Sequence, residues 1–227
     1  MADKDTILRK LKSLGNPDSV EGMARYGINP KKTYGVSIPN LRRIAGDIGK
    51  DHLLARQLWE SGIHEARILA SMIDDPGKVT EKQMEQWVRD FDSWDVCDEC
   101  CMNLFEDTPF AYSKCFEWSS RSEEFVKRAS FVLMARLAVS DKKADDGQFL
   151  RFLPLIRREA SDERNFVKKA VNWALRQIGK RNLRLHRQAI KVGKEIQRLP
   201  SKCAQWIASD ALRELTNKKI LQRLRPS

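Results

Sequence analysis

Two segments decide the fold class: EEFVKRASFVLMARLA at residues 123–138 and RNFVKKAVNWALRQIG at residues 164–179. They align at an offset of 41 residues, so that Phe125 matches Phe166 and both segments read FVK at the same place. A period of about 40 to 47 residues with paired helices is typical of HEAT and armadillo arrays. Chance similarity between two amphipathic helices is the alternative, because such periodicity is common. If the repeat is real, the equivalent helices stack side by side and line one concave face.

The rest of the chain carries the same helical pattern, with apolar residues three and four positions apart and no convincing alternation of period two. The apolar stripes run through residues 7–14, 38–48, 63–73, 84–91, 96–105, 125–137, 149–156, 166–178 and 206–215. A looser repeat relates residues 174–176 to residues 211–213. Gly, Pro and Asn residues punctuate the segments, and no low-complexity linker divides them. The sequence therefore predicts an all-α, HEAT-like helical-repeat solenoid that forms a single domain over residues 1–227.

The charge of the chain is strongly basic and unevenly placed. Lys and Arg number 42 against 31 Asp and Glu, for a net charge of +11. Residues 164–227 hold 17 basic and 3 acidic residues, a local charge of +14, which leaves −3 for the residues before them. Such an asymmetry favours a polyanionic partner, and it predicts nucleic acid bound in a basic concave groove. A merely solvated basic surface is the alternative, since charge determines partners and solubility rather than fold.

The hydropathy pattern and the cysteines indicate where in the cell the protein is expected to be. No segment approaches the roughly 18 continuous apolar residues of a spanning helix. The start MADKDTILRKLKSL has no apolar signal core. The five cysteines are an odd number without a secretory signal, which favours free thiols in a reducing compartment. We therefore expect a soluble cytoplasmic protein that does not associate with membranes, and we expect it to be a monomer.

The stretch FDSWDVCDECC, residues 91–101, gathers four carboxylates, one tryptophan and three cysteines. Its C-x-x-C suggests zinc, but structural zinc needs four ligands, usually as two spaced pairs, and no histidine stands at such a spacing to a cysteine. Cys97, Cys101 and Leu104 instead have the spacing of a buried helical stripe. These thiols are better interpreted as small buried hydrophobes. We expect no metal and no cofactor.

The repeat alignment also places charged residues at equivalent positions. An offset of 30 residues aligns Asp98 with Arg128, and the offset of 41 carries Arg128 to Lys169. Trp94 precedes Asp98 by four residues and Trp173 follows Lys169 by four, so each tryptophan shares a helix face with its charged neighbour. One carboxylate, two cations and two aromatic rings are thus predicted to face one groove.

Each of these residues also has a purely structural interpretation. Core packing explains most tryptophans and is the alternative for Trp94 and Trp173. We expect core packing for Trp59, Trp87, Trp118 and Trp206. A helix dipole favours a carboxylate in the first turn, which is the alternative for Asp98, although Asp95 stands nearer the helix start and fits that role better.

Together the groove residues suit a specific chemistry. Arg and Lys hold a phosphate backbone, and aromatic faces attract cations. A lone carboxylate near a sugar can stabilise an oxocarbenium-like transition state or orient a water. A base that alkylation has already made cationic leaves without protonation, so one carboxylate can suffice. The set is therefore suited to cleavage of the N-glycosidic bond of a cationic base.

These residues lie in motifs through which the chain resembles the AlkD-like DNA glycosylases, HEAT-like repeat proteins of DNA alkylation repair. The motifs are MARYGI (residues 23–28), YGVSIPNLR (34–42), SWDVCD (93–98), FVKRA (125–129) and KKAVNWALR (168–176). The resemblance runs over most of the chain. It implies excision of cationic N3- and N7-alkylpurines from double-stranded DNA without a deep base pocket, unlike most base-processing enzymes.

The resemblance also implies roles for individual residues. Trp94 and Trp173 match the tryptophans that flank the lesion, Asp98 matches the catalytic aspartate, and Arg128 matches the arginine that grips the backbone there. Further candidates for DNA binding are Lys169 and Arg176, which flank Trp173, and Tyr26. The alternative function is a non-catalytic helical-repeat module that binds nucleic acid or an acidic protein partner, because fold alone does not determine reaction.

Overall fold

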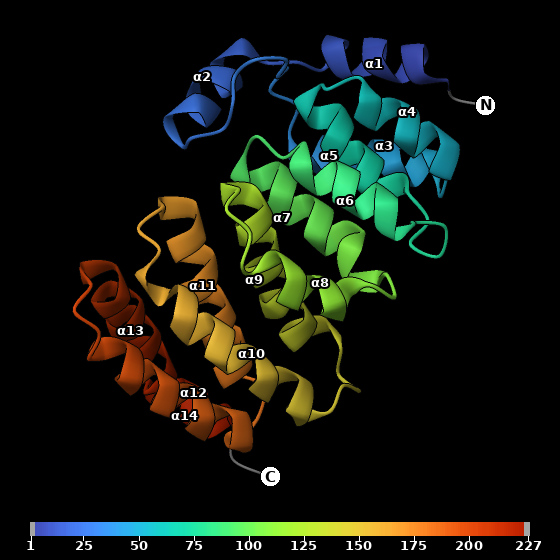
Figure 1. Ribbon diagram of the computed structural model, residues 1–227. Helices are drawn as coiled ribbons and strands as arrows, with labels where there is room; N and C mark the ends of the chain where they lie inside the picture. Colours follow the sequence, from blue (N-terminus) through green and yellow to red (C-terminus); the bar gives the residue numbers. More distant parts are fainter. Residues whose placement is uncertain (1–2, 225–227) are drawn as a thin grey trace. The chain divides into compact units, whose positions relative to one another are not determined.

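The computed structural model describes residues 3–224, and every regular element among them is helical (Figure 1). The α-helices are α1 (Lys4–Ser13), α2 (Pro17–Arg25), α3 (Ile38–Ile48), α4 (His52–Glu60), α5 (His64–Ile73), α6 (Glu81–Arg89), α7 (Trp94–Asn103), α8 (Ala111–Trp118), α9 (Glu124–Ser140), α10 (Asp146–Arg158), α11 (Asn165–Gly179), α12 (Leu183–Gln197), α13 (Lys202–Leu215) and α14 (Lys218–Leu224). Two short 3₁₀ helices, η1 (Phe105–Asp107) and η2 (Glu159–Ser161), complete the set. The predicted all-α class is confirmed.

The chain divides into two compact units, residues 1–109 and residues 110–227. The first unit holds α1 to α7 with η1, and the second holds α8 to α14 with η2. Each unit has its own buried core of aliphatic and aromatic side chains. We describe each unit by itself.

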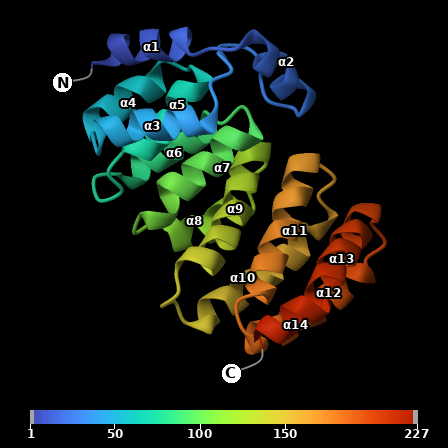
Figure 2. The ribbon, with the colours of Figure 1, turned by 180° about the vertical axis from the view of Figure 1, so that it is seen from behind.

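In the second unit, α9, α11 and α13 form a row, with α8 packed on α9 and with α10 and α12 forming a second layer (Figure 2). The rings of Phe125 and Phe166, matched by the repeat alignment, lie 5.6 Å apart between centroids. Farther along the row, the buried amide of Asn172 donates to the carbonyl oxygen of Ile207 at 3.1 Å. The predicted side-by-side stacking of the equivalent helices α9 and α11 is thus confirmed.

In the first unit, α5 packs between α3 and α7, and α4 packs against α5. The helices α4 and α6 meet through Trp59 and Trp87, whose rings stack at 3.9 Å with an interplanar angle of 3°. Both tryptophans are buried, as is Trp118 in the second unit. The expectation of core packing is confirmed for these three residues.

A buried carboxylate fixes the segment that leads into α3. Glu65 in α5 is fully buried and accepts hydrogen bonds from the backbone N–H groups of Tyr34, Gly35 and Val36 at 2.9, 2.6 and 3.2 Å. Gly35 has φ +79°, and a β-carbon there would lie 2.2 Å from the carbonyl oxygen of Asn16. Only glycine fits this left-handed, crowded position. The YGV sequence therefore locks the loop onto α5.

All nine predicted helical segments lie on helices, but the apolar pattern missed α2, α4, α8, α12 and α14. The reason is clearest for α12, whose buried side includes His186, Ala189 and Gly193, which a search for large apolar residues does not count. The start of α7 is also two residues earlier than the pattern indicated, so Trp94 is its first helical residue.

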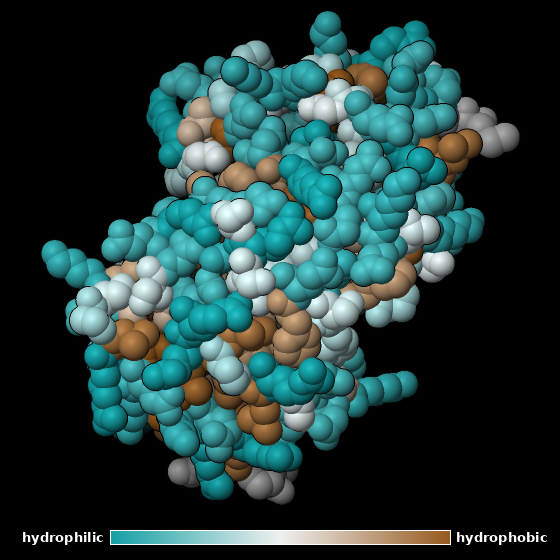
Figure 3. Space-filling view, viewed as in Figure 1, coloured by the Kyte–Doolittle hydropathy of each residue, from teal (hydrophilic) through white to brown (hydrophobic). Residues whose placement is uncertain are grey.

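Hydrophilic side chains predominate on the face drawn in Figure 3, with hydrophobic ones in smaller groups between them. None of the helices described in residues 3–224 has the length and apolarity needed to span a bilayer.

Candidate functional site

The first unit holds Trp94 at the start of α7 by a tertiary hydrogen bond. The indole Nε1 donates to the backbone carbonyl oxygen of Tyr26 at 3.1 Å. Trp94 is half-buried, whereas the Tyr26 side chain is 75% exposed. The structure thus brings together two of the predicted site residues from segments 68 positions apart.

Asp98 lies one helical turn after Trp94 on the same helix and is half-buried. Residues at this spacing share a helix face. Between them, Cys97 is buried, as are Cys100 and Cys101 farther along the helix. The predicted buried cysteine stripe is therefore confirmed. That Trp94 and Asp98 face a groove stays a prediction.

The cysteines are buried throughout the chain, as expected. Burial raises the pKa values of the Cys100, Cys101 and Cys115 thiols well above the ordinary range. Because the thiolate is the reactive form, such thiols are inert. Among residues 3–224, no group of three or more His, Cys, Asp or Glu side chains is arranged to hold a metal ion.

The loop before α7 is tied down by side chains from three other segments. The indole of Trp59 donates to Asp90 Oδ2 at 2.9 Å, and the Arg67 guanidinium donates to the Asp90 carbonyl oxygen at 2.8 Å. Asn29 Nδ2 donates to Asp92 Oδ2 at 2.9 Å. The direction in which α7 begins is therefore set by tertiary contacts.

His64 is a residue of this site that sequence reasoning missed. Its Nε2 lies 2.9 Å from Asp95 Oδ2, and both side chains are largely buried. Burial lowers the pKa of His64, but the Asp95 carboxylate more than offsets this effect, so the pKa is raised above its ordinary value. Asp95 stands in the first turn of α7, as expected, and has this second role as an ion-pair partner.

In the second unit, Arg128 lies in α9 and is only 6% exposed. Its Nη1 donates to the carbonyl oxygen of Phe166, in the first turn of α11, at 2.6 Å. This placement differs from the groove-facing position that the repeat alignment suggests. The guanidinium lies between α9 and α11 because it donates there to the carbonyl oxygen of Phe166. Contact of Arg128 with a phosphate stays a prediction.

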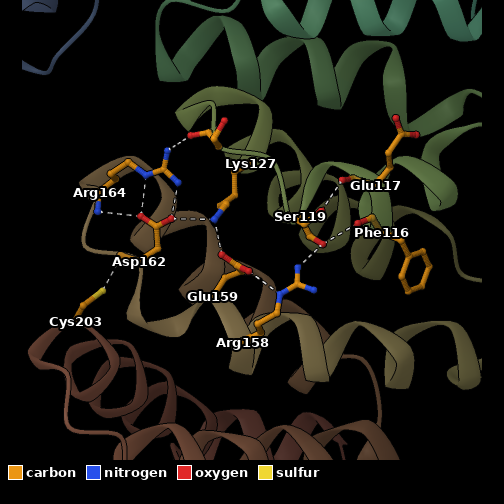
Figure 4. Close-up of polar contacts among 11 residues, drawn as sticks. Phe116, Glu117, Ser119, Lys127, Arg158, Glu159, Asp162, Arg164 and Cys203 are labelled. Carbon is orange, nitrogen blue, oxygen red and sulfur yellow. Dashed lines mark hydrogen bonds and ion pairs between the residues drawn. The ribbon is translucent and has the colours of Figure 1, made fainter.

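A polar network beside Arg128 joins α9 to the segment before α11 (Figure 4). Lys127 Nζ pairs with Glu159 at 2.5 Å and with Asp162 at 3.3 Å. Asp162 also accepts from Arg164, and its backbone carbonyl oxygen accepts from the thiol of Cys203 at 3.0 Å. Burial raises the pKa of Asp162, but the bonds from Arg164 and Lys127 prevail and lower it. The network holds the starts of α9, α11 and α13 together.

The other predicted residues of the second unit lie on α11 in different environments. Lys169 is exposed and Trp173 is half-buried. Arg176 is engaged by α13, since its Nη1 pairs with Glu214 at 2.5 Å, and Lys180 pairs with the same carboxylate. Burial raises the pKa of Glu214, but these two cations lower it overall. Of these two cations on α11, Lys169 is thus the more accessible.

The expectation that Trp206 is a core residue is wrong. Its side chain is 43% exposed on α13, and Lys168 Nζ lies 4.9 Å from the ring centroid. The ring is stabilised in part by this cation–π contact rather than by burial. The offset of 37 residues that relates α11 to α13 carries Lys169 to Trp206, so the structure adds an aromatic residue to the aligned positions.

The two units present different chemical groups. The first unit presents an aromatic ring and a carboxylate one turn apart, which suits contact with a sugar and a cationic base. The second unit presents lysines and two partly exposed tryptophans, which suits a nucleic-acid backbone.

Comparison with solved structures supports the fold. The chain superposes with a TM-score of 0.78 and 19% identity on a protein described as a new family related to the HEAT-like repeat DNA glycosylases with affinity for branched DNA structures; the match covers 93% of this chain and 95% of that one. A designed armadillo repeat protein matches with a TM-score of 0.37 and 15% identity over 78% of this chain and 92% of its own, which is too distant to carry an argument. No curated protein matches the sequence significantly.

The sequence was also compared with models of protein families. Residues 7–215 match the family model described as DNA alkylation repair enzyme. The match spans both units and includes every residue assigned above to the candidate site. The chain belongs to the DNA alkylation repair enzyme family.

Proposed function

We propose that the protein is a DNA glycosylase that hydrolyses the N-glycosidic bond of cationic N3- and N7-alkylpurines in duplex DNA. The observation that carries the proposal is the pair on α7: a half-buried tryptophan held by Tyr26, followed one turn later by a half-buried carboxylate. Membership of a DNA alkylation repair family gives this pair its context.

In this mechanism the alkylated base leaves as a neutral purine, because alkylation has already placed the positive charge on it. Positive charge then develops on the deoxyribose, and Asp98 stabilises it and orients the attacking water. The ring of Trp94 contacts the cationic base and the sugar. No general acid is needed for the leaving group, which accounts for a site with one carboxylate.

The second unit contributes to DNA binding in the proposal. Lys169 is the accessible cation for a phosphate, and Trp173 offers an aromatic edge one turn farther along α11. Arg128 anchors the start of α11, about two turns before Trp173, through its bond to Phe166. The role of Arg128 at a DNA phosphate rests on the resemblance alone.

The test is release of free base from a duplex that carries a single 7-methylguanine. We expect wild-type protein to release the base and Asp98→Asn to release it at least about 100-fold more slowly, as for loss of a group that stabilises transition-state charge. Duplex affinity should stay within a few-fold of wild type. Glu99→Gln is the matched control, since Glu99 is a half-buried carboxylate on the same helix that pairs with Asn103. Wild-type protein that binds the duplex without releasing base contradicts the proposal.

A second candidate is a non-catalytic protein that binds branched DNA. One observation favours it: the protein that superposes at a TM-score of 0.78 is described as having affinity for branched DNA structures. The two candidates separate in a competition experiment. A binder of branched DNA should prefer a four-way junction over a duplex of equal length and composition, and it should leave 7-methylguanine in place.

A further inference from the structure

The first turn of α7 lacks the usual side-chain cap. The first N–H groups of a helix have no partner within the helix, and a serine at the N-cap usually accepts from one of them. Ser93 occupies the N-cap of α7 and is buried, yet within residues 3–224 its hydroxyl makes no hydrogen bond. Contacts from other segments must therefore determine where this turn lies.

Two such contacts act on adjacent residues. Trp94 is bonded to the Tyr26 carbonyl oxygen, and Asp95 lies 2.9 Å from the imidazole Nε2 of His64. His64 is the first residue of α5, and its own backbone N–H donates to the carbonyl oxygen of Lys32 at 3.0 Å. The imidazole is thus held beside Asp95 by its main chain and by burial, in an ion-pair contact that lacks the alignment of a hydrogen bond.

The charges around His64 favour the imidazolium form. Asp95 faces it from α7, Asp92 from the preceding loop, and Glu65 is its neighbour on α5. Two cations lie nearby: Arg67 on α5, 3.8 Å from Asp92, and Lys32, whose side chain lies against Gly62. Burial lowers the pKa of His64, but the carboxylates, Asp95 foremost, raise it overall. The attraction to Asp95 therefore persists to a higher pH than it would for an unperturbed imidazole.

We propose that His64 and Asp95 form a positioning pair that holds the first turn of α7, and with it Trp94 and Asp98, in the geometry required for base release. Asp95 lies between Trp94 and Asp98 on α7. A shift of its carboxylate that displaces the backbone of this turn therefore also displaces the other two residues. The inference rests on the proposed glycosylase function. His64 acts through Asp95 and is not assigned a contact with the substrate.

The pair predicts a pH dependence of defined sign. The pKa of His64 in the folded protein is raised above its ordinary value of 6.5. Its ionic contribution is therefore complete below that value and is lost as the pH rises through the folded pKa. The rate of base release should therefore fall as the pH rises through the folded pKa of His64, because neutral imidazole holds Asp95 less firmly. We call this fall the alkaline limb of the pH profile.

The experiment measures kcat and KM for release of 7-methylguanine from pH 5.5 to 9 with wild type, His64→Gln and His52→Gln. His52 is the matched control, because its Nδ1 pairs with Asp74 at 2.6 Å in the same unit but not at α7. We expect His64→Gln to lower kcat about 10-fold with little change in KM and to lose the alkaline limb, as for a misplaced catalytic group. His52→Gln should keep the limb. Retention of the limb and of wild-type kcat by His64→Gln overturns the proposal.

A second measurement needs no activity and leaves both members of the His64–Asp95 pair in place. In NMR spectra of wild-type protein, the indole N–H resonance of Trp94, assigned with Trp94→Phe, should shift with the titration of the His64 ring. An indole resonance that is insensitive to this titration overturns the positioning role. Absence of base release at every pH contradicts the proposed function instead, while the NMR titration still decides whether the pair positions α7.

Discussion

The two units of the chain differ sharply in charge. Residues 1–109 contain 15 basic and 19 acidic residues, for a net charge of −4, whereas residues 110–227 contain 27 basic and 12 acidic residues, for a net charge of +15. The acidic unit carries Asp98, and the basic unit carries Lys169. A polyanion is attracted by the second unit and repelled by the first, so the carboxylate chemistry that we propose for Asp98 would lie in the unit that attracts DNA least.

The units also use their carboxylates differently. In the first unit, Glu65 and Asp74 are fully buried and accept bonds from backbone N–H groups or from neutral and imidazole donors. In the second, Glu159, Asp162 and Glu214 accept from Lys and Arg in ion pairs, and the Glu214 side chain is 28% exposed. Buried acceptors give precise positions, and partly exposed pairs are screened and more replaceable. Under the proposed function, the first unit would hold the reacting groups and the basic second unit would bind the DNA.

The largest effect should come from removing the buried carboxylate of the first unit. Glu65→Ala leaves the N–H groups of Tyr34, Gly35 and Val36 without their acceptor. At about 1–3 kcal/mol for each buried unsatisfied group, we expect the free energy of unfolding to fall by at least about 3 kcal/mol. Urea denaturation followed by circular dichroism measures this change.

Two controls sharpen the comparison between the units. Glu60→Ala, at an exposed position on α4, should change the free energy of unfolding by less than about 0.5 kcal/mol. Asp162→Ala removes a partner of Lys127 and Arg164 in the second unit and should cost about 1 kcal/mol, because Glu159 still pairs with Lys127 and Arg164 still donates to the Ser122 carbonyl oxygen. An Asp162→Ala loss as large as that of Glu65→Ala would remove the proposed difference between the units.

A smaller effect is expected on DNA affinity from a single exposed lysine of the second unit. Lys169→Gln should weaken duplex binding and reduce the slope of log K against log salt by about 0.9, the value for one lost phosphate contact. Arg176→Gln should change the slope less, because that guanidinium is engaged by Glu214. Fluorescence anisotropy between 50 and 200 mM salt measures both. Arg187→Gln, an exposed change on α12 in the other helical layer, is the control.

The sequence predicts what depends on neighbours within one helix and misses what depends on contacts between helices. The i, i+4 spacing of Trp94 and Asp98 and the buried cysteine stripe follow from helical periodicity alone. The His64–Asp95 pair joins positions 31 apart, as does the bond from Trp59 to Asp90. This separation is close to the offset of 30 that aligns Asp98 with Arg128, so a signal was present in the repeat.

Two further differences have the same origin. The repeat alignment places Arg128 beside the buried stripe, but a long side chain at that boundary can turn inward when a main-chain acceptor is available, as Phe166 provides. Trp206 differs in the opposite direction: it is expected in the core but is exposed. Its ring is not covered by the core, and the cation of Lys168 stabilises it instead. Periodicity gives the position of a residue around its helix but not the partner that the neighbouring helix offers.

The smallest predicted effect concerns Trp206. If the second unit binds the DNA backbone along α11 and α13, the exposed ring and Lys168 form one contact surface, with the lysine at a phosphate and the ring edge against a sugar. Trp206→Ala should then weaken duplex affinity about three-fold, corresponding to the roughly 0.5–1 kcal/mol of an exposed cation–π contact. It should leave the salt slope unchanged, because no charge is removed. Trp206→Phe should retain most of the affinity. A Trp206→Ala variant with wild-type affinity would place this edge of α13 outside the DNA-binding surface, and binding would then be confined to α9 and α11.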